Sequence, residues 1–125
     1  MLASNLLRVS VVLLSIGMIL GIEMGVTQDF RLVPAHAHLN LVGAVVPFLA
    51  GLYYQAAPQA AKGWFAQVHV CIAVAAALVF PIGIGAVLLG GAAYEPVAIA
   101  GGLLALLGTL LFAIIVFRNG ARTRE

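Results

Sequence analysis

Long apolar stretches alternate with short polar breaks along the whole chain. The apolar stretches cover about residues 5–27, 34–55, 64–89 and 94–117. Each is long enough for an α-helix to cross the hydrocarbon core of a bilayer, which takes about 20 residues. The breaks hold residues that end helices, such as Asp29, Pro58 and Gly90. We therefore predict an all-α integral membrane protein, a bundle of four spanning helices.

The composition supports a membrane protein. Of the 125 residues, 64% are hydrophobic and 8% are charged, whereas soluble domains carry about 25% charged residues. The four spans and their short loops use almost all of the chain, so we expect one domain over residues 1–125. The formal charge of +2 is too small to indicate a nucleic-acid partner. A single cysteine, Cys71, excludes an internal disulfide and a multi-cysteine metal cluster.

Basic residues predict the orientation of the helices. The cationic side chains on the side of the two termini are Arg8, Lys62, Arg118, Arg122 and Arg124, and Arg31 is on the opposite side. Cytoplasmic loops carry an excess of Lys and Arg, so we expect both termini in the cytoplasm. In a bacterium this describes a multi-pass protein of the inner membrane. No signal-peptide cleavage motif follows the first span, so we expect that span to be retained.

Small residues recur on the predicted helices about once per turn. They are Gly17, Gly21 and Gly25 in the first, Gly43, Pro47 and Gly51 in the second, and Gly101 and Ala105 in the fourth. Faces of this kind let membrane helices approach closely, and Pro47 should also kink the second helix. Two interpretations stay open: packing within one bundle, or the interface of a homo-oligomer.

The second span opens with two ionisable side chains, His36 and His38. Ionisable groups inside a span are candidates for function, because they are costly to bury in hydrocarbon. Side chains two residues apart point about 200° away from each other on an α-helix. The two rings therefore suit different partners, one on each side of the helix. Each ring is either a cofactor ligand or a hydrogen-bonded structural group.

Further polar side chains share the depth of this pair near the predicted outer surface. They are Glu23 on the first helix, Asn40 on the second, and Tyr94 and Glu95 at the start of the fourth. A histidine that binds a metal usually donates its other N–H to a carboxylate, carbonyl or amide, so Glu23, Asn40 and Glu95 could support the rings. Glu23 could also bind a metal directly, together with His36 and His38. Glu95 has an alternative role, as a carboxylate favoured by the helix dipole.

His69 stands apart from this group. It lies one to two turns into the third span from the cytoplasmic side, roughly 15 Å from the outer polar residues. It is therefore excluded as the opposite ligand of a haem held by His38 in the same protomer, and we expect it to bond a backbone carbonyl. Cys71 points to another face of this helix, so a joint metal site with His69 is not expected. An aromatic belt at the same interface comprises Tyr53, Tyr54 and Trp64.

The segment from Ala35 to Tyr54, which begins Ala-His-Ala-His-Leu-Asn, resembles the tenth helix of the haem–copper oxidase large subunit, in particular its nitric oxide reductase and C-type oxidase branches. In that family a His-x-His pair begins a helix at the periplasmic end and binds two haems. The resemblance implies that His36 matches the ligand of the high-spin haem and His38 that of the low-spin haem. The chain then looks like a stand-alone relative covering about the ninth to twelfth helices of the family.

The chain also departs from that family. The histidines of the family's copper site have no counterpart here, and neither does the opposing ligand of the low-spin haem. We therefore do not expect this chain alone to reduce oxygen or nitric oxide.

Three functions remain in competition. The first is a small haem b protein for electron transfer or diatomic gas binding, its second iron ligand supplied by another copy of the chain or left open. The second is a non-haem copper or zinc site built from His36 or His38 with Glu23, since nitrogen and oxygen ligands suit both metals. The third is a non-catalytic accessory or assembly subunit of a respiratory complex.

Overall fold

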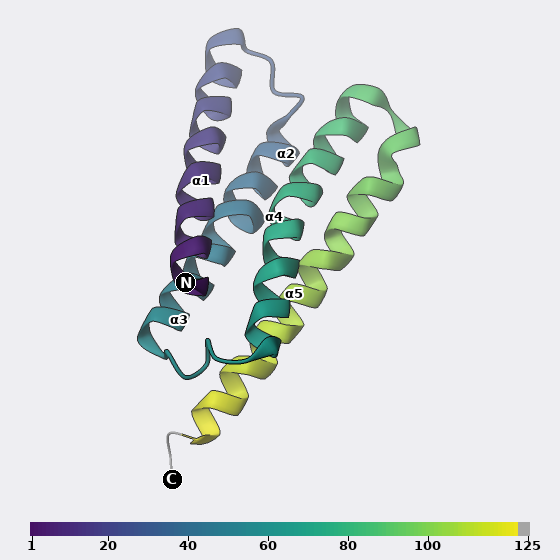
Figure 1. The fold of residues 1–125 in the computed structure, drawn as a ribbon. Coiled ribbons are helices and arrows are strands. Elements are labelled where there is room, and N and C mark those ends of the chain that lie inside the picture. The colour runs from purple at the N-terminus through teal and green to yellow at the C-terminus, as the bar shows by residue number, and fades with distance from the viewer. Residues whose placement is uncertain (123–125) are drawn as a thin grey trace.

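The computed structural model of the chain describes residues 1–122, with the side chains of residues 1–120. This part contains four helices that are long and apolar enough to cross a membrane (Figure 1). They cover Leu2–Thr27, Val33–Ala56, Trp64–Gly90 and Ala92–Gly120. The predicted all-α bundle of four spans is confirmed. Each predicted boundary lies within a few residues of the observed one.

The spans divide into shorter elements. In chain order they are α1 (Leu2–Thr27), α2 (Val33–His38), the π-helical segment η1 (Leu39–Val45), α3 (Val46–Ala56), α4 (Trp64–Gly90), the 3₁₀ turn η2 (Ala92–Tyr94) and α5 (Glu95–Arg122). The second span consists of α2, η1 and α3 without a break. Glycines with positive φ flank α4 on both sides, Gly63 at 93° and Gly91 at 89°. Glycine adopts such angles at little steric cost, so α4 begins and ends at sharp changes of chain direction.

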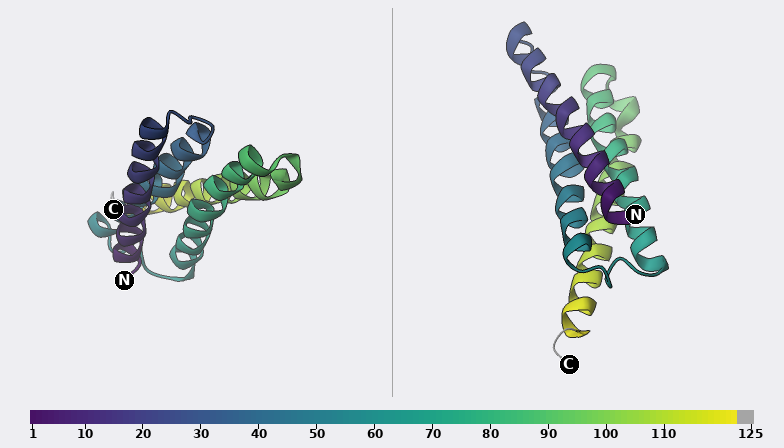
Figure 2. Two further views of the ribbon diagram at one scale, coloured as in Figure 1. Left: turned by 90° about the horizontal axis from the view of Figure 1, so that it is seen from above. Right: turned by 60° about the vertical axis from the view of Figure 1, so that its left-hand side comes forward.

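The helices form two antiparallel hairpins that lie side by side (Figures 1 and 2). α1 pairs with the second span, and α4 pairs with α5, while α4 also contacts α2 and η1. The first residues of α1, the last residues of α5 and the loop at residues 57–63 lie toward one end of the bundle, called here the terminus end (Figure 1). The turns at residues 28–32 and 91–94 lie toward the other end, called the far end. Successive spans therefore run in opposite directions, as the sequence predicts.

The largest buried cluster lies at the terminus end and joins both hairpins. Its buried side chains are Leu6, Ala50, Tyr54, Ala66, Val70 and Ile115. A smaller cluster of Leu13, Ala44 and Ala77 lies between α1, η1 and α4. Large apolar side chains such as Ile19, Ile22 and Leu103 are exposed, which suits helices that are surrounded by lipid.

The glycines of α1 let the second span approach closely. A Cβ on Gly21 would lie 2.9 Å from Cε1 of His36. Gly17 lies against the amide of Asn40 in the same way, whereas a Cβ on Gly25 would have nothing within 4 Å. Packing within the bundle is therefore the role of Gly17 and Gly21, and Gly25 does not share it.

α4 and α5 pack backbone to backbone. A Cβ on Gly83 would lie 2.6 Å from the backbone nitrogen of Ala98, and one on Gly101 would lie 2.5 Å from Cα of Phe80. A real Cβ at either position would overlap the main chain of the other helix. Gly101 thus has the packing role that its spacing predicts, and Gly83 shares that role.

The distortion expected at Pro47 takes the form of a π-helical turn. η1 ends two residues before Pro47 in the chain, and the N–H of Val46 donates to the carbonyl of Leu41, five residues back. Proline has no N–H, and local π adjustments of this kind satisfy the freed backbone groups of membrane helices. The widened turn directly follows the histidine pair.

A second proline, Pro81, lies inside α4. Because it lacks an N–H, it leaves the carbonyl of Ala77 without its usual helical donor. A Cβ on Gly43 of η1 would lie 3.2 Å from this oxygen. The absence of a side chain at Gly43 therefore lets η1 approach the main chain of α4 closely, where the two hairpins meet.

Candidate cofactor site

The histidine pair lies near the far end of the second span, and its two rings face different helices. His36 packs against Gly21 of α1. His38 packs against Phe80 of α4, edge to face, with ring centroids 4.8 Å apart. The two rings thus have separate partners on opposite sides of one helix, as their spacing predicts.

His38 has one ring nitrogen engaged and the other available. Its Nδ1 lies 2.7 Å from the carbonyl oxygen of Pro34. A carbonyl can only accept, so Nδ1 carries the proton and Nε2 keeps its lone pair. No hydrogen-bond partner for Nε2 exists among the described residues. A backbone carbonyl fixes the tautomer of metal-binding histidines in the same way, and the ring is only half-buried.

His36 is enclosed more tightly. The amide nitrogen of Asn40 lies 3.2 Å from Nε2 and 3.4 Å from Nδ1 of the ring. Asn40 thus contacts His36, as their spacing predicts, but through its NH2 group, which donates to the ring and is not the acceptor expected for a ring N–H. The other amide atom, Oδ1 of Asn40, is buried against Gly17 and has no partner within the described part of the chain. With α1 on one side and the amide on the other, this ring is less open to a ligand than that of His38.

The carboxylates lie away from the rings. Glu23 and Glu95 are both exposed, and in the described chain neither forms a hydrogen bond or ion pair with a histidine. Glu23 comes two residues after Gly21, which turns it about 200° away from the face that contacts His36. Glu95 comes six residues before Gly101, about 9 Å further toward the far end than the level of Phe80 and His38.

These positions bear on the predicted metal ligands. Among residues 1–120, no three His, Cys, Asp or Glu side chains lie close enough together to hold a metal ion. His36, His38 and Glu23 are thus not brought together within one chain.

His69 belongs to a separate cluster at the terminus end. Its Nδ1 lies 2.8 Å from the hydroxyl of Tyr54, and its ring stacks on Phe112 with centroids 5.1 Å apart. The prediction of a backbone carbonyl partner is wrong, because the phenol occupies that position. The prediction that Tyr54 lies in an interfacial belt is also wrong, since its side chain is 2% exposed, whereas Trp64 is 70% exposed.

A signal for this contact was present in the sequence. Tyr54 lies a few residues before the 57–63 loop and His69 a few residues after Gly63. An antiparallel hairpin places such residues at similar depth. The distance to the pair also agrees with expectation, because His69 and Phe80 are eleven residues apart on α4, or about 16 Å. Cys71 is exposed.

Two apolar cavities flank the second span. One, of about 350 Å³, lies between α1, the second span and α4, and its walls include Ala35 and Leu39 but neither histidine of the pair. The other, of about 230 Å³, lies between the second span, α4 and α5, and His69 forms part of its wall. We call the second one the α5 cavity.

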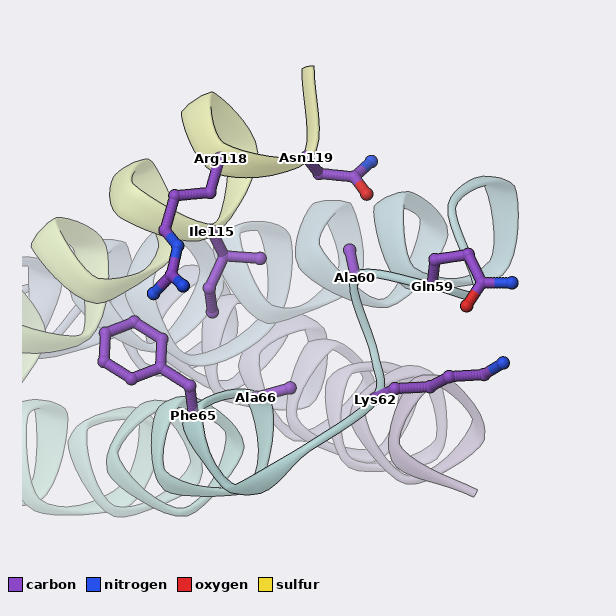
Figure 3. Close-up of a pocket in the computed structure, with 8 residues that line it drawn as sticks. All are labelled: Gln59, Ala60, Lys62, Phe65, Ala66, Ile115, Arg118 and Asn119. Atoms are coloured by element: carbon purple, nitrogen blue, oxygen red, sulfur yellow. The ribbon is translucent and has the colours of Figure 1, made fainter. Parts of the chain in front are cut away.

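A smaller pocket of about 120 Å³ lies at the terminus end. Its lining residues are Gln59, Ala60, Lys62, Phe65, Ala66, Ile115, Arg118 and Asn119 (Figure 3). The side chains of Lys62 and Arg118 extend in different directions (Figure 3). Cζ of Arg118 lies 5.9 Å from the centroid of the Phe65 ring, a cation–π contact. The two cations do not converge on a single point.

Comparisons with known proteins do not identify a family for this chain. The chain matches no protein-family model, no curated protein and no solved structure.

Proposed function

We propose that the chain is a haem b-binding membrane protein in which Nε2 of His38 is the axial ligand of the iron. The observation that carries the proposal is the hydrogen bond from Nδ1–H of His38 to the Pro34 carbonyl. It holds the ring in the tautomer that leaves a lone pair on Nε2. The ring lies in a membrane span, where an ionisable side chain is costly to bury and is therefore a candidate for function. The resemblance to the haem–copper oxidase large subunit supports the same residue.

The number of ligands near His38 favours a haem over a small ion. Phe80 of α4 adds an aromatic ring beside the imidazole. Since no carboxylate bonds to His38 in the described chain, a copper or zinc ion would find too few ligands there. A haem needs only one or two axial ligands from protein and would supply one-electron chemistry or gas binding.

Neither of the other histidines can complete the coordination in the same chain. His36 faces α1, on the opposite side of the second span, and His69 lies about 16 Å from the level of His38. A second ligand would therefore come from another copy of the chain, which would make a homo-oligomer part of the site, or the iron would stay open to a diatomic gas. A bacterial inner membrane and association with a respiratory partner fit this chemistry.

The test is an absorption spectrum of the protein purified gently from its own host, oxidised and reduced. We expect a Soret band and a haem-to-protein ratio that falls about tenfold or more in His38→Ala. His69→Gln should keep the ratio of the native chain. The thermal unfolding of both variants is recorded to show that each is folded.

Two results would overturn the proposal. One is native protein that holds no iron porphyrin. The other is equal loss of haem in the His38 and His69 variants, which would contradict their separation. If the native protein instead contains copper or zinc by elemental analysis, the non-haem alternative replaces it.

A further inference from the structure

The α5 cavity has an apolar wall interrupted by two polar side chains. Its lining residues are Val42, Val46, Pro47, Ala50, His69, Ala73, Ala76, Ala105, Leu106, Gly108, Thr109 and Phe112. Small residues on α4 and α5 account for much of the wall and create the space. The exposed side chains of Val46, Leu106 and Thr109 place its mouth on the lipid-facing side of the bundle.

The hydrogen bond to Tyr54 determines which ring nitrogen of His69 carries the proton. Tyr54 is buried, and its hydroxyl has one partner among the described residues, Nδ1 of His69. A buried O–H is almost always donated, so the phenol donates to Nδ1 and the proton of the ring sits on Nε2. If Nδ1–H donated instead, the hydroxyl hydrogen of Tyr54 would be left without an acceptor.

Among the described residues Nε2–H of His69 has no hydrogen-bond partner, and the residue lines the α5 cavity. The residue is only 3% exposed, yet Nε2 has no partner within the described chain and is not among its fully buried unsatisfied atoms. The cavity is the space that His69 lines. The hydroxyl of Thr109 already donates to the carbonyl of Ala105, so His69 supplies the side-chain N–H donor of the cavity.

We propose that the α5 cavity binds the headgroup of a membrane quinone, with a quinone carbonyl accepting the hydrogen bond from Nε2–H of His69. Phe112, which stacks on His69, also lines the cavity and adds an aromatic side chain to its wall, against which a planar ring packs well. A volume of about 230 Å³ is below the roughly 300–1,000 Å³ of sites for drug-sized ligands. It suits one substituted ring, with the apolar tail left in the bilayer.

A phospholipid is the alternative occupant, because its acyl ester also carries a carbonyl in an apolar chain. The aromatic wall favours the quinone, since an ester has no ring to pack on Phe112. The cavity also extends from His69 to Ala76, seven residues along α4, which is about 10 Å. This length leaves room for a headgroup bound at one end to pass through the mouth at Leu106 into the lipid.

The experiment uses the full chain in nanodiscs of phosphatidylcholine, titrated with decylubiquinone. With ¹⁵N-labelled histidine, we expect the Nε2–H signal of His69 to be present without quinone and to shift as quinone is added. His69→Phe should weaken binding about tenfold, because it removes the one donor. His69→Gln, which keeps an amide N–H, should weaken it less.

A second pair of variants tests the cavity without touching His69. Ala105→Phe fills the cavity and should abolish quinone binding, whereas Ala100→Phe, on the exposed side of α5, should leave it unchanged. Unchanged quinone affinity in His69→Phe and Ala105→Phe would overturn the proposal. So would a bound phospholipid, seen by native mass spectrometry, that is lost in Ala105→Phe and is not displaced by decylubiquinone. Protein prepared without haem serves equally well, so this test does not depend on His38.

Discussion

The three histidines of the chain each have a hydrogen-bond partner of a different chemical kind. His38 donates to a backbone carbonyl, His36 meets the amide of Asn40, and His69 accepts from the phenol of Tyr54. These partners decide which ring nitrogen is left available. His38 keeps a lone pair for a metal, whereas His69 presents an N–H for a carbonyl. One hydrogen-bond partner for each ring thus makes His38 a possible metal ligand and His69 a hydrogen-bond donor.

The sequence predicted the partners that lie on the same helix. His36 and Asn40 are four residues apart, so helical spacing alone brings them together. The contact between Tyr54 and His69 joins two helices, and its geometry depends on how each helix is rotated about its axis. Apolar residues cover every side of these helices, so the sequence contains no amphipathic pattern that would fix this rotation.

The far-end turn at residues 28–32 contains an ion pair with a measurable pH dependence. Nη2 of Arg31 lies 2.6 Å from Oδ2 of Asp29, and hydrogen bonds from Arg31 lower the pKa of Asp29 from 3.8 to about 2. The lowered pKa means that the pair is complete above pH 3.8 and is lost as the pH falls through about 2. We expect the carboxyl ¹³C shift of Asp29 to titrate with a midpoint near pH 2. In Arg31→Gln this midpoint should move toward pH 3.8. An Asp29 midpoint that is the same in both proteins would contradict the ion pair.

At the scale of helices, prolines and glycines determine how the elements meet. η1 widens the second span next to Pro47, and Pro81 frees a carbonyl that Gly43 approaches. The spacing of small residues predicted that helices approach one another closely, and it did so correctly for Gly17, Gly21 and Gly101. It did not predict the π-helical form of the second span. A π turn satisfies backbone groups differently from an α turn but leaves no distinct pattern of side chains.

The contact between α4 and α5 predicts different outcomes for the same substitution at two glycines. Gly83→Ala would place a Cβ 2.6 Å from the backbone nitrogen of Ala98, whereas in Gly108→Ala the nearest atom is 3.5 Å away, an ordinary contact. We expect Gly83→Ala to destabilise the protein by about 1–3 kcal/mol. Gly108→Ala should be neutral or stabilising by up to about 1 kcal/mol, because alanine favours helices.

The measurement is thermal unfolding in detergent micelles, followed by far-ultraviolet circular dichroism. A lower midpoint in Gly83→Ala alone supports the backbone-to-backbone contact. Equal midpoints in the two variants would show that the main chains of α4 and α5 are further apart at Gly83 than this contact requires.

For the whole molecule, hydropathy and length were sufficient to predict the number and limits of the spans and that successive spans run in opposite directions. A helix that crosses a bilayer has a nearly fixed length, so depth follows from position in the chain. The lateral arrangement did not follow. The sequence placed six polar residues at one depth. For Glu95 that depth is wrong, since it lies about 9 Å beyond the level of His38. Glu23 is on the exposed face of α1, away from the rings. Equal depth does not imply contact when the helices are free to rotate.

The distribution of basic residues predicts which end of the bundle faces the cytoplasm. Lys62 lies in the 57–63 loop, and Arg8 and Arg118 lie on the terminus-end parts of α1 and α5, whereas Arg31 lies in the far-end turn at residues 28–32. Arg124 lies outside the described residues. In a Cys71→Ala background, we expect a membrane-impermeant maleimide to label Phe30→Cys in intact cells. Gln59→Cys should react only after the membrane is opened. Labelling of the two positions in the reverse order would place the termini outside.

The interface between α4 and α5 also bears on biogenesis. Where Gly83 and Gly101 bring two main chains together, there are no rotamers that could adjust to a different neighbour. A three-residue 3₁₀ turn joins the two helices, so the partners are delivered to each other as soon as α5 is made. We therefore expect the second half of the chain to enter the bilayer as one hairpin, and a nascent chain halted before α5 to leave Gly83 without its partner helix.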